Sequence, residues 1–129
     1  MKKLIIIFIM SGIGSTALAS ESECLSRILY AESRGQSIEG VISVGQAAVE
    51  KAKKEHLTLC KLNGVNRKTP IKELAEYYLL LAKHLVLHPS KSVSLGADHW
   101  NTGKKPALPG KVTRQIEGHV LYIMQAKAE

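Results

Sequence analysis

The sequence predicts a small α+β domain that is mainly helical, with about three to four helices and a small β element near the C-terminal end. Apolar residues recur at helical spacing in three separate stretches before residue 88, which favours helices there. Glycines and prolines then gather in residues 89–110, which is typical of a long irregular loop. The β-prone run at 119–123, HVLYI, predicts a strand after this loop.

We expect the first helix over residues 23–34. Gly35 is a natural stop for it, because glycine adopts positive φ at little cost. An apolar stripe at helical spacing forms the inward face of this helix: Leu25, Ile28 and Leu29.

A second helix is expected over residues 38–54. Ser37 precedes it in the position of an N-cap, where a hydroxyl accepts a hydrogen bond from the first turn. Gly45 and the alanines of its apolar stripe permit close packing against another helix. Cations crowd the last turn, where they suit the helix dipole: Lys51, Lys53 and Lys54.

A third helix is expected over about 70–87. Thr69-Pro70 is a good start, since a capping side chain precedes a proline at the first helical position, and Pro89 ends the helix. Five residues are expected to face inward: Leu74, Tyr77, Tyr78, Leu81 and Leu85.

The last segment, 111–124, fits two structures. Val112, Ile116 and Val120 recur at a spacing that fits a helix, while the run that follows residue 118 favours a strand. We expect a short helical turn followed by a strand.

Residues 1–19 have the features of a secretory signal peptide rather than of the fold. Lys2 and Lys3 precede a short apolar run, and a small-x-small site ends at Ala19. A membrane anchor is the alternative, but the run is shorter than the roughly 20 residues of a span. The chain therefore divides into a leader, 1–19, and one exported domain, 20–129, that is periplasmic or secreted and has no stable membrane span after cleavage.

The full chain has 129 residues and a formal net charge of +7, and removal of the two leader lysines lowers the charge to +5. This length fits one domain and excludes a multidomain enzyme. A basic exported protein has anionic candidate partners, among them cell-wall glycan, lipid headgroups and DNA. Asp98 is the only aspartate, so a cage of several carboxylates for Ca²⁺ is hard to assemble.

Cys24 and Cys60 are the only cysteines, and they lie 36 residues apart. An even count in a small exported domain favours a disulfide between them, with two free buried thiols as the alternative. The closed loop would contribute about 3–4 kcal/mol in the chain-entropy model.

Glu32 follows Ile28 by four residues, which places its carboxylate on the apolar face of the first helix. Burial raises the pKa of an unpaired carboxyl group, and a protonated carboxyl near neutral pH is what a general acid requires. The alternative is a carboxylate that turns to solvent or pairs with Arg27 or Arg34. Glycoside hydrolysis usually needs two carboxylates, for which Glu39 and Asp98 are the candidate partners.

Residues 24–36, CLSRILYAESRGQ, resemble the opening Tyr-x-Glu-(Ala/Ser)-Arg-Gly motif of the SleB-type cell wall hydrolases, a family that includes the spore-cortex-lytic enzymes. The Glu-Gly step at 39–40 resembles the one that follows in the family. The later segments GADHW, 96–100, and IEGHVLY, 116–122, resemble the family's Gly-Ala-Thr-His-Tyr block and its closing Ile-Gly-x-His-x-Phe-Tyr. The resemblance covers about 24–122.

This resemblance implies a lysozyme-like domain that cleaves peptidoglycan, most simply as a lytic transglycosylase between N-acetylmuramic acid and N-acetylglucosamine. The family's catalytic glutamate corresponds to Glu32. One carboxylate suffices in that mechanism, because the muramyl 6-hydroxyl replaces water as the nucleophile. Six further residues are candidates for substrate binding: Tyr30, Arg34, Asp98, His99, Trp100 and His119.

Several of these residues have structural alternatives. Tyr30 and Trp100 are as well suited to core packing as to a cleft, Arg34 to orienting Glu32, and His119 to a structural role. The segment 56–72 lacks the aromatic residues that many family members have there. A non-catalytic peptidoglycan-binding protein and a hydrolytic muramidase therefore remain alternatives.

No metal or other cofactor is expected. His84 and His88 have the i, i+4 spacing of metal ligands, but no HExxH motif is present, and two surface or core histidines are the simpler interpretation. Peptidoglycan is the expected partner rather than nucleic acid, and we expect the protein to be a monomer.

Overall fold

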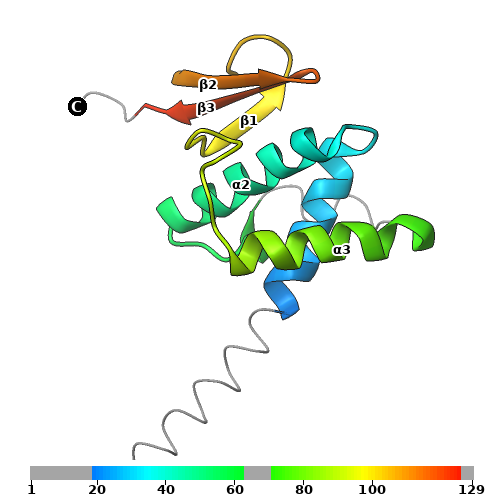
Figure 1. The fold of residues 1–129 in the computed structure, drawn as a ribbon. Coiled ribbons are helices and arrows are strands. Elements are labelled where there is room, and N and C mark those ends of the chain that lie inside the picture. Colours follow the sequence, from blue (N-terminus) through cyan, green and yellow to red (C-terminus); the bar gives the residue numbers. More distant parts are fainter. Residues whose placement is uncertain (1–18, 63–70, 126–129) are drawn as a thin grey trace, which may run out of the picture.

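The computed structural model describes residues 19–62 and 71–125. Within these residues three helices precede a three-stranded antiparallel sheet (Figure 1), so the mainly helical α+β prediction is confirmed. The predicted leader, apart from Ala19, and the predicted helix start at Thr69-Pro70 lie outside the described residues.

The first two helices follow the sequence prediction closely. The first is described over residues 19–33, and Gly35 after it has φ of +85°. The second, α2 (Ile38–Lys54), has the predicted bounds. Its N-cap is Ser37, whose hydroxyl accepts a hydrogen bond from the Gly40 amide at 3.3 Å. Side-chain capping thus fixes the start of α2 as expected.

Helix α3 (Lys72–Leu87) ends before Pro89, as predicted. Tyr78 is buried, but Tyr77 is 37% exposed, so the prediction that both rings face inward is wrong for Tyr77. Consecutive helical residues lie about 100° apart around the axis, and only one of this pair can point at the core. The exposed Tyr77 ring instead packs edge-on against Tyr78, with the ring centroids 5.0 Å apart.

The sheet has the order β1-β3-β2, formed by β1 (His99–Thr102), β2 (Gly110–Ile116) and β3 (His119–Met124). The predicted helical turn after residue 110 is wrong, since β2 occupies that segment. A two-residue turn joins β2 to β3, and its residues Glu117 and Gly118 have φ of +47° and +85°. Positive φ at both positions is the mark of a type I′ turn, which suits the twist of a hairpin.

Helix α2 lies between the sheet and the other helices (Figure 1). Ala48 belongs to the main core, which the three helices and the short 3-10 helix η1 (Leu59–Lys61) build. The preceding residue, Ala47, packs instead under the sheet with Ala97 and Leu121. Small residues along α2 therefore allow it to be buried on two sides.

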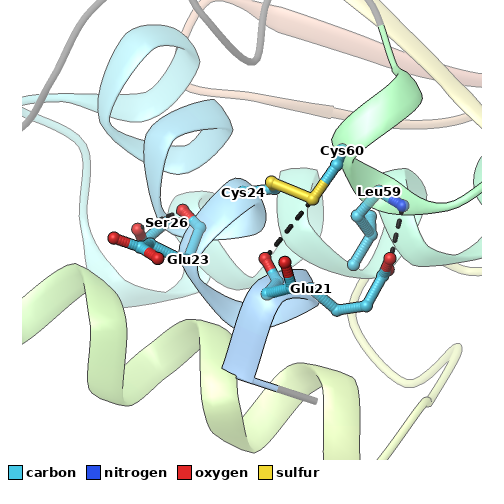
Figure 2. The surroundings of a disulfide bond; sticks show 7 residues. Glu21, Glu23, Cys24, Ser26, Leu59 and Cys60 are labelled. Atoms are coloured by element: carbon cyan, nitrogen blue, oxygen red, sulfur yellow. Dashed lines mark hydrogen bonds between the residues drawn. A yellow bond between two sulfur atoms is a disulfide. The ribbon is translucent and has the colours of Figure 1, made fainter. Parts of the chain in front are cut away.

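Cys24 and Cys60 form the expected disulfide, with their Cα atoms 5.1 Å apart. Figure 2 shows that it joins the first helix to η1. Beside it, the Glu21 carboxylate accepts a hydrogen bond of 2.9 Å from the Leu59 amide. The covalent bond and this hydrogen bond together hold η1 against the first helix.

Candidate functional site

Glu32 lies in the last turn of the first helix and is half-buried. The helix ends one residue later, at 33, and the Gln36 amide donates a hydrogen bond to the Ser33 carbonyl at 3.0 Å to close the turn. The carboxylate thus stands at the junction between the first helix and α2, neither in the dry core nor on an open surface.

The neighbouring motif residues Tyr30 and Arg34 contact each other. Arg34 donates a hydrogen bond to the Tyr30 hydroxyl at 2.8 Å, and its guanidinium carbon lies 4.8 Å from the centroid of that ring. Tyr30 is buried and packs edge-on against Tyr78 at 5.7 Å between centroids. Burial raises the pKa of the Tyr78 hydroxyl. The Tyr30 ring therefore belongs to the core, and the guanidinium group of Arg34 packs over this ring.

The turn between β2 and β3 docks onto the start of α2. The Glu117 carboxylate accepts hydrogen bonds from the Ser37 amide at 3.0 and 3.2 Å and from the Ser37 hydroxyl at 2.9 Å. An anion at this place is favourable, since the amides at a helix start carry partial positive charge. Gly40 makes room, because a Cβ there would collide with the side chains of Glu117 and Gln36.

This docking brings His119, the first residue of β3, to the Glu32 end of α2. The His119 ring is 5% exposed, and its Nδ1 is hydrogen-bonded to the Gln36 side-chain amide. Burial lowers the pKa of the His119 imidazole below its ordinary value, and the charges of Glu32 and Glu117 oppose that shift. Glu32 and His119 thus share one electrostatic neighbourhood.

Asp98 and His99 lie in a different place, at the C-terminal end of α2. The Asp98 carboxylate is 2.8 Å from Lys54 Nζ and accepts hydrogen bonds from His99 Nδ1 at 2.8 Å and from the Met124 amide at 2.9 Å. Burial alone raises the pKa of the Asp98 carboxyl, but the hydrogen bonds from Lys54, His99 and Met124 outweigh it and hold the pKa below its ordinary value.

These residues line a cavity of about 260 Å³. Its walls come from the end of α2 and from one end of the sheet, where β1 begins and β3 ends: Lys51, Lys54, Glu55, Asp98, His99 and Met124. A second cavity, of about 350 Å³, lies between α2 and the loop at Pro89.

Trp100 is half-buried and packs against both hydrophobic clusters. Of the two roles considered for Trp100, core packing and cleft lining, these contacts correspond to core packing.

The candidate residues therefore form two groups rather than one. In the register of the sheet, Thr102 pairs with His119 while His99 pairs with Tyr122. Three strand residues separate the two positions, or about 10 Å along β3. Glu32 and His119 belong to one end of α2, and Asp98 and His99 to the other.

Sequence reasoning missed two residues of the Glu32 group, Gln36 and Glu117. They lie 81 residues apart and meet through a hydrogen bond of 3.1 Å from the Gln36 amide to the Glu117 carbonyl. The one local signal for this contact is Gly118, which suits the positive φ of a hairpin turn. Glu39, the other carboxylate considered beside Glu32, forms an ion pair with Arg114.

Comparison of the chain with protein-family models, with curated proteins and with solved structures found no match.

The described residues contain no candidate metal site and no candidate membrane span. Within residues 19–62 and 71–125, no three histidine, cysteine, aspartate or glutamate side chains are grouped so as to hold a metal ion. His84 of α3 and the exposed His88, which follows the helix as its C-cap, do contact each other, with the ring centroids 5.0 Å apart. Over the same part of the chain, the helices are too short or too polar to cross a membrane.

Proposed function

We propose that the protein cleaves the glycan strands of peptidoglycan as a lytic transglycosylase, with Glu32 as the single catalytic residue. The observation that carries the proposal is the position of Glu32. It is half-buried at the end of the first helix and shares its surroundings with a buried histidine. The motif around it, Tyr30-x-Glu32-x-Arg34-Gly35, resembles that of the SleB-type hydrolases.

In this mechanism Glu32 acts first as an acid and then as a base. The protonated carboxyl gives its proton to the glycosidic oxygen as the bond to the muramyl anomeric carbon breaks. The resulting carboxylate takes the proton of the muramyl 6-hydroxyl, whose oxygen closes onto the anomeric carbon. The products are a shortened strand and a 1,6-anhydromuramyl end, and Glu32 recovers its proton.

The separation of the two residue groups bears on the choice between transglycosylase and hydrolase. A hydrolase needs a second carboxylate about 5–10 Å from the first. Asp98 is held by Lys54 and His99 at the other end of α2, and Glu39 pairs with Arg114. Both candidates for a second carboxylate are thus engaged elsewhere, which favours a mechanism with one glutamate.

The test is digestion of purified peptidoglycan, with the released fragments identified by mass spectrometry. We expect 1,6-anhydromuropeptides from the wild-type protein and a loss of at least about 100-fold in their rate of release with Glu32→Gln, as removal of a general acid predicts. Glu76→Gln is the matched control, since Glu76 lies exposed on α3, and it should retain full activity.

Other outcomes decide between the alternatives. Reducing-end products would indicate a muramidase, and Asp98→Asn and Glu39→Gln would then identify the second carboxylate. Co-sedimentation with peptidoglycan without any product would indicate a non-catalytic binding protein and would overturn the proposal.

A further inference from the structure

Residues 103–109 join β1 to β2, and we call them the crossover loop. The side chain of Asn101, in β1, holds the middle of this loop. It donates a hydrogen bond to the Lys105 carbonyl at 3.0 Å and accepts one from the Ala107 amide at 2.8 Å. The backbone of the loop is therefore fixed against the sheet.

Gln115 of β2 holds the crossover loop from the other side, because its side chain donates a hydrogen bond to the Lys104 carbonyl at 3.0 Å. Asn101 and Gln115 both pair with Val120 in the register of the sheet. Side chains of paired residues emerge on the same face, so the loop crosses β3 on the face of Val120. Leu121, on the opposite face, packs toward α2. The crossover loop thus covers the face of the sheet that is turned away from the helices.

The outer surface of the crossover loop and of β2 is rich in cations. Lys104, Lys105 and Lys111 are exposed, and none of them belongs to an ion pair among the described residues. No acidic residue occurs in the sequence between Asp98 and Glu117. The first of these carboxylates is buried, and the second is held at the start of α2. The charge of the three lysines is therefore available to an anionic partner.

Three large apolar side chains are exposed beside these cations. Leu108, Val112 and Met124 are each between 41% and 47% exposed. Gly110 pairs with Met124, which brings Met124 to the end of the crossover loop, and Val112 follows two residues along β2 on the same face. An exposed apolar patch with a polar rim is typical of a protein–protein or membrane contact.

We propose that the crossover loop docks on an anionic lipid surface, with its lysines among the phosphate groups and Leu108 inserted at the boundary with the acyl chains. A lysine can lay its aliphatic stem along apolar surface while its ammonium group stays among polar groups. Neither cavity described above is lined by the crossover loop, and a flat anionic layer needs no shaped pocket. This inference goes beyond the proposed function and does not depend on it.

The exposed apolar side chains of α3 differ in their surroundings and provide an internal comparison. Leu80 and Leu87 are exposed there, but Glu73 and Glu76 are exposed on the same helix and would be repelled by an anionic layer. Figure 1 shows α3 on the other side of α2 from the sheet. Changes on α3 therefore match those on the crossover loop without touching it.

The test is co-sedimentation of the protein, purified after export through its own leader, with lipid vesicles. We expect binding to vesicles of equal parts phosphatidylglycerol and phosphatidylcholine, weakened by salt, and none to phosphatidylcholine alone. Lys104→Gln with Lys105→Gln should weaken binding about 25-fold, at about fivefold for each lysine. Leu108→Ser, which changes no charge, should weaken it at least about fivefold.

The matched controls are Lys72→Gln with Lys83→Gln, and Leu80→Ser, all at exposed positions of α3. Each should change the affinity by less than about threefold, because a charge acts on the lipid surface only within about a Debye length. Urea unfolding of every variant should match the wild type, since all these side chains are exposed.

A wild-type protein that does not sediment with anionic vesicles would overturn the inference, and so would an equal loss with the two lysine pairs. Leu108→Ser that binds as tightly as the wild type would indicate a purely ionic surface, such as one for a soluble anionic polymer, and would also overturn it. If the protein releases no muropeptide from peptidoglycan, the proposed function fails, while the vesicles still decide this inference.

Discussion

At the scale of single residues, Asp98 shows how a buried charge makes stability depend on pH. Its side chain is 6% exposed and is held by Lys54, His99 and the Met124 amide. Because these contacts lower the pKa of the carboxyl below its ordinary value of 3.8, the ionised form stabilises the folded state. That contribution is present above the unfolded-state pKa and is lost as the pH falls through the lower folded-state pKa.

We expect Asp98→Asn to lower the free energy of unfolding by about 1–2 kcal/mol at pH 7, since Lys54 is half-exposed and regains water when its partner is lost. The difference from wild type should shrink as the pH falls below the ordinary carboxyl pKa of 3.8 and through the lower folded-state pKa. Urea unfolding at a series of pH values measures it. A difference that stays constant with pH would contradict the assigned role of the charge, and Glu76→Gln should show no difference at any pH.

Single residues also show what the sequence could not reveal about the site. Glu32 was identifiable because its spacing from Ile28 and its motif are local features of one helix. Gln36 and Glu117 were not, because their contact joins segments that only the finished fold brings together. The same long-range geometry placed Asp98 and His99 away from Glu32, which no local pattern indicates.

At the scale of elements, the close contact of α2 with its neighbours depends on Gly45. A Cβ at this position would collide with the Leu85 side chain of α3 and lie 3.2 Å from Leu29 of the first helix. We expect Gly45→Ala to destabilise the protein by about 1 kcal/mol, because an overpacking cost of about 1–3 kcal/mol exceeds the gain of about 1 kcal/mol in helix propensity.

A double-mutant cycle separates these two effects. Leu85→Ala alone should cost about 2–5 kcal/mol as a core cavity. Combined with Gly45→Ala, it should cost less than the sum of the two single changes, because the added methyl group then enters vacated space. Denaturant unfolding of the four proteins measures the coupling, and simple additivity would argue against the contact.

Elements differ in how well the sequence predicts them. Ser37 and Gly35 marked the ends of two helices, because capping and positive φ are local requirements. Strand β2 was mistaken for a helical turn because the four-residue spacing of Val112 and Ile116 fits the apolar face of a helix. In the structure an irregularity in the strand pairing between Val112 and Arg114 shifts the register, and Val112 is exposed while Ile116 packs under the sheet. The type I′ turn was also obscured, since Glu117 stands where asparagine or glycine is usual.

At the scale of the whole molecule, the disulfide is the main covalent restraint on a small domain. It joins Cys24 of the first helix to Cys60 of η1 across 36 residues. We expect Cys24→Ala with Cys60→Ala to lower the free energy of unfolding by about 3–4 kcal/mol, through the greater entropy of the unfolded chain. Denaturant unfolding with and without a reductant measures it.

Reductant supplies the control for this change. It should destabilise the wild-type protein by a similar amount and leave the double variant unaffected, because the variant has no disulfide to lose. A double variant as stable as the oxidised wild type would show that non-covalent contacts, such as that of Glu21 with the Leu59 amide, hold η1 by themselves.

The docking of the β2–β3 turn also has a consequence for the order in which the molecule is assembled. Ser37 and Glu117 are 80 residues apart, so their contact closes a long loop and cannot form early while the chain emerges from its N-terminus. Glu32 is synthesised among the first residues of the domain, whereas His119 joins it only when nearly the whole chain has emerged. The site is therefore a late product of folding, and a chain halted before the hairpin would contain the glutamate without the surroundings that we propose make it an acid.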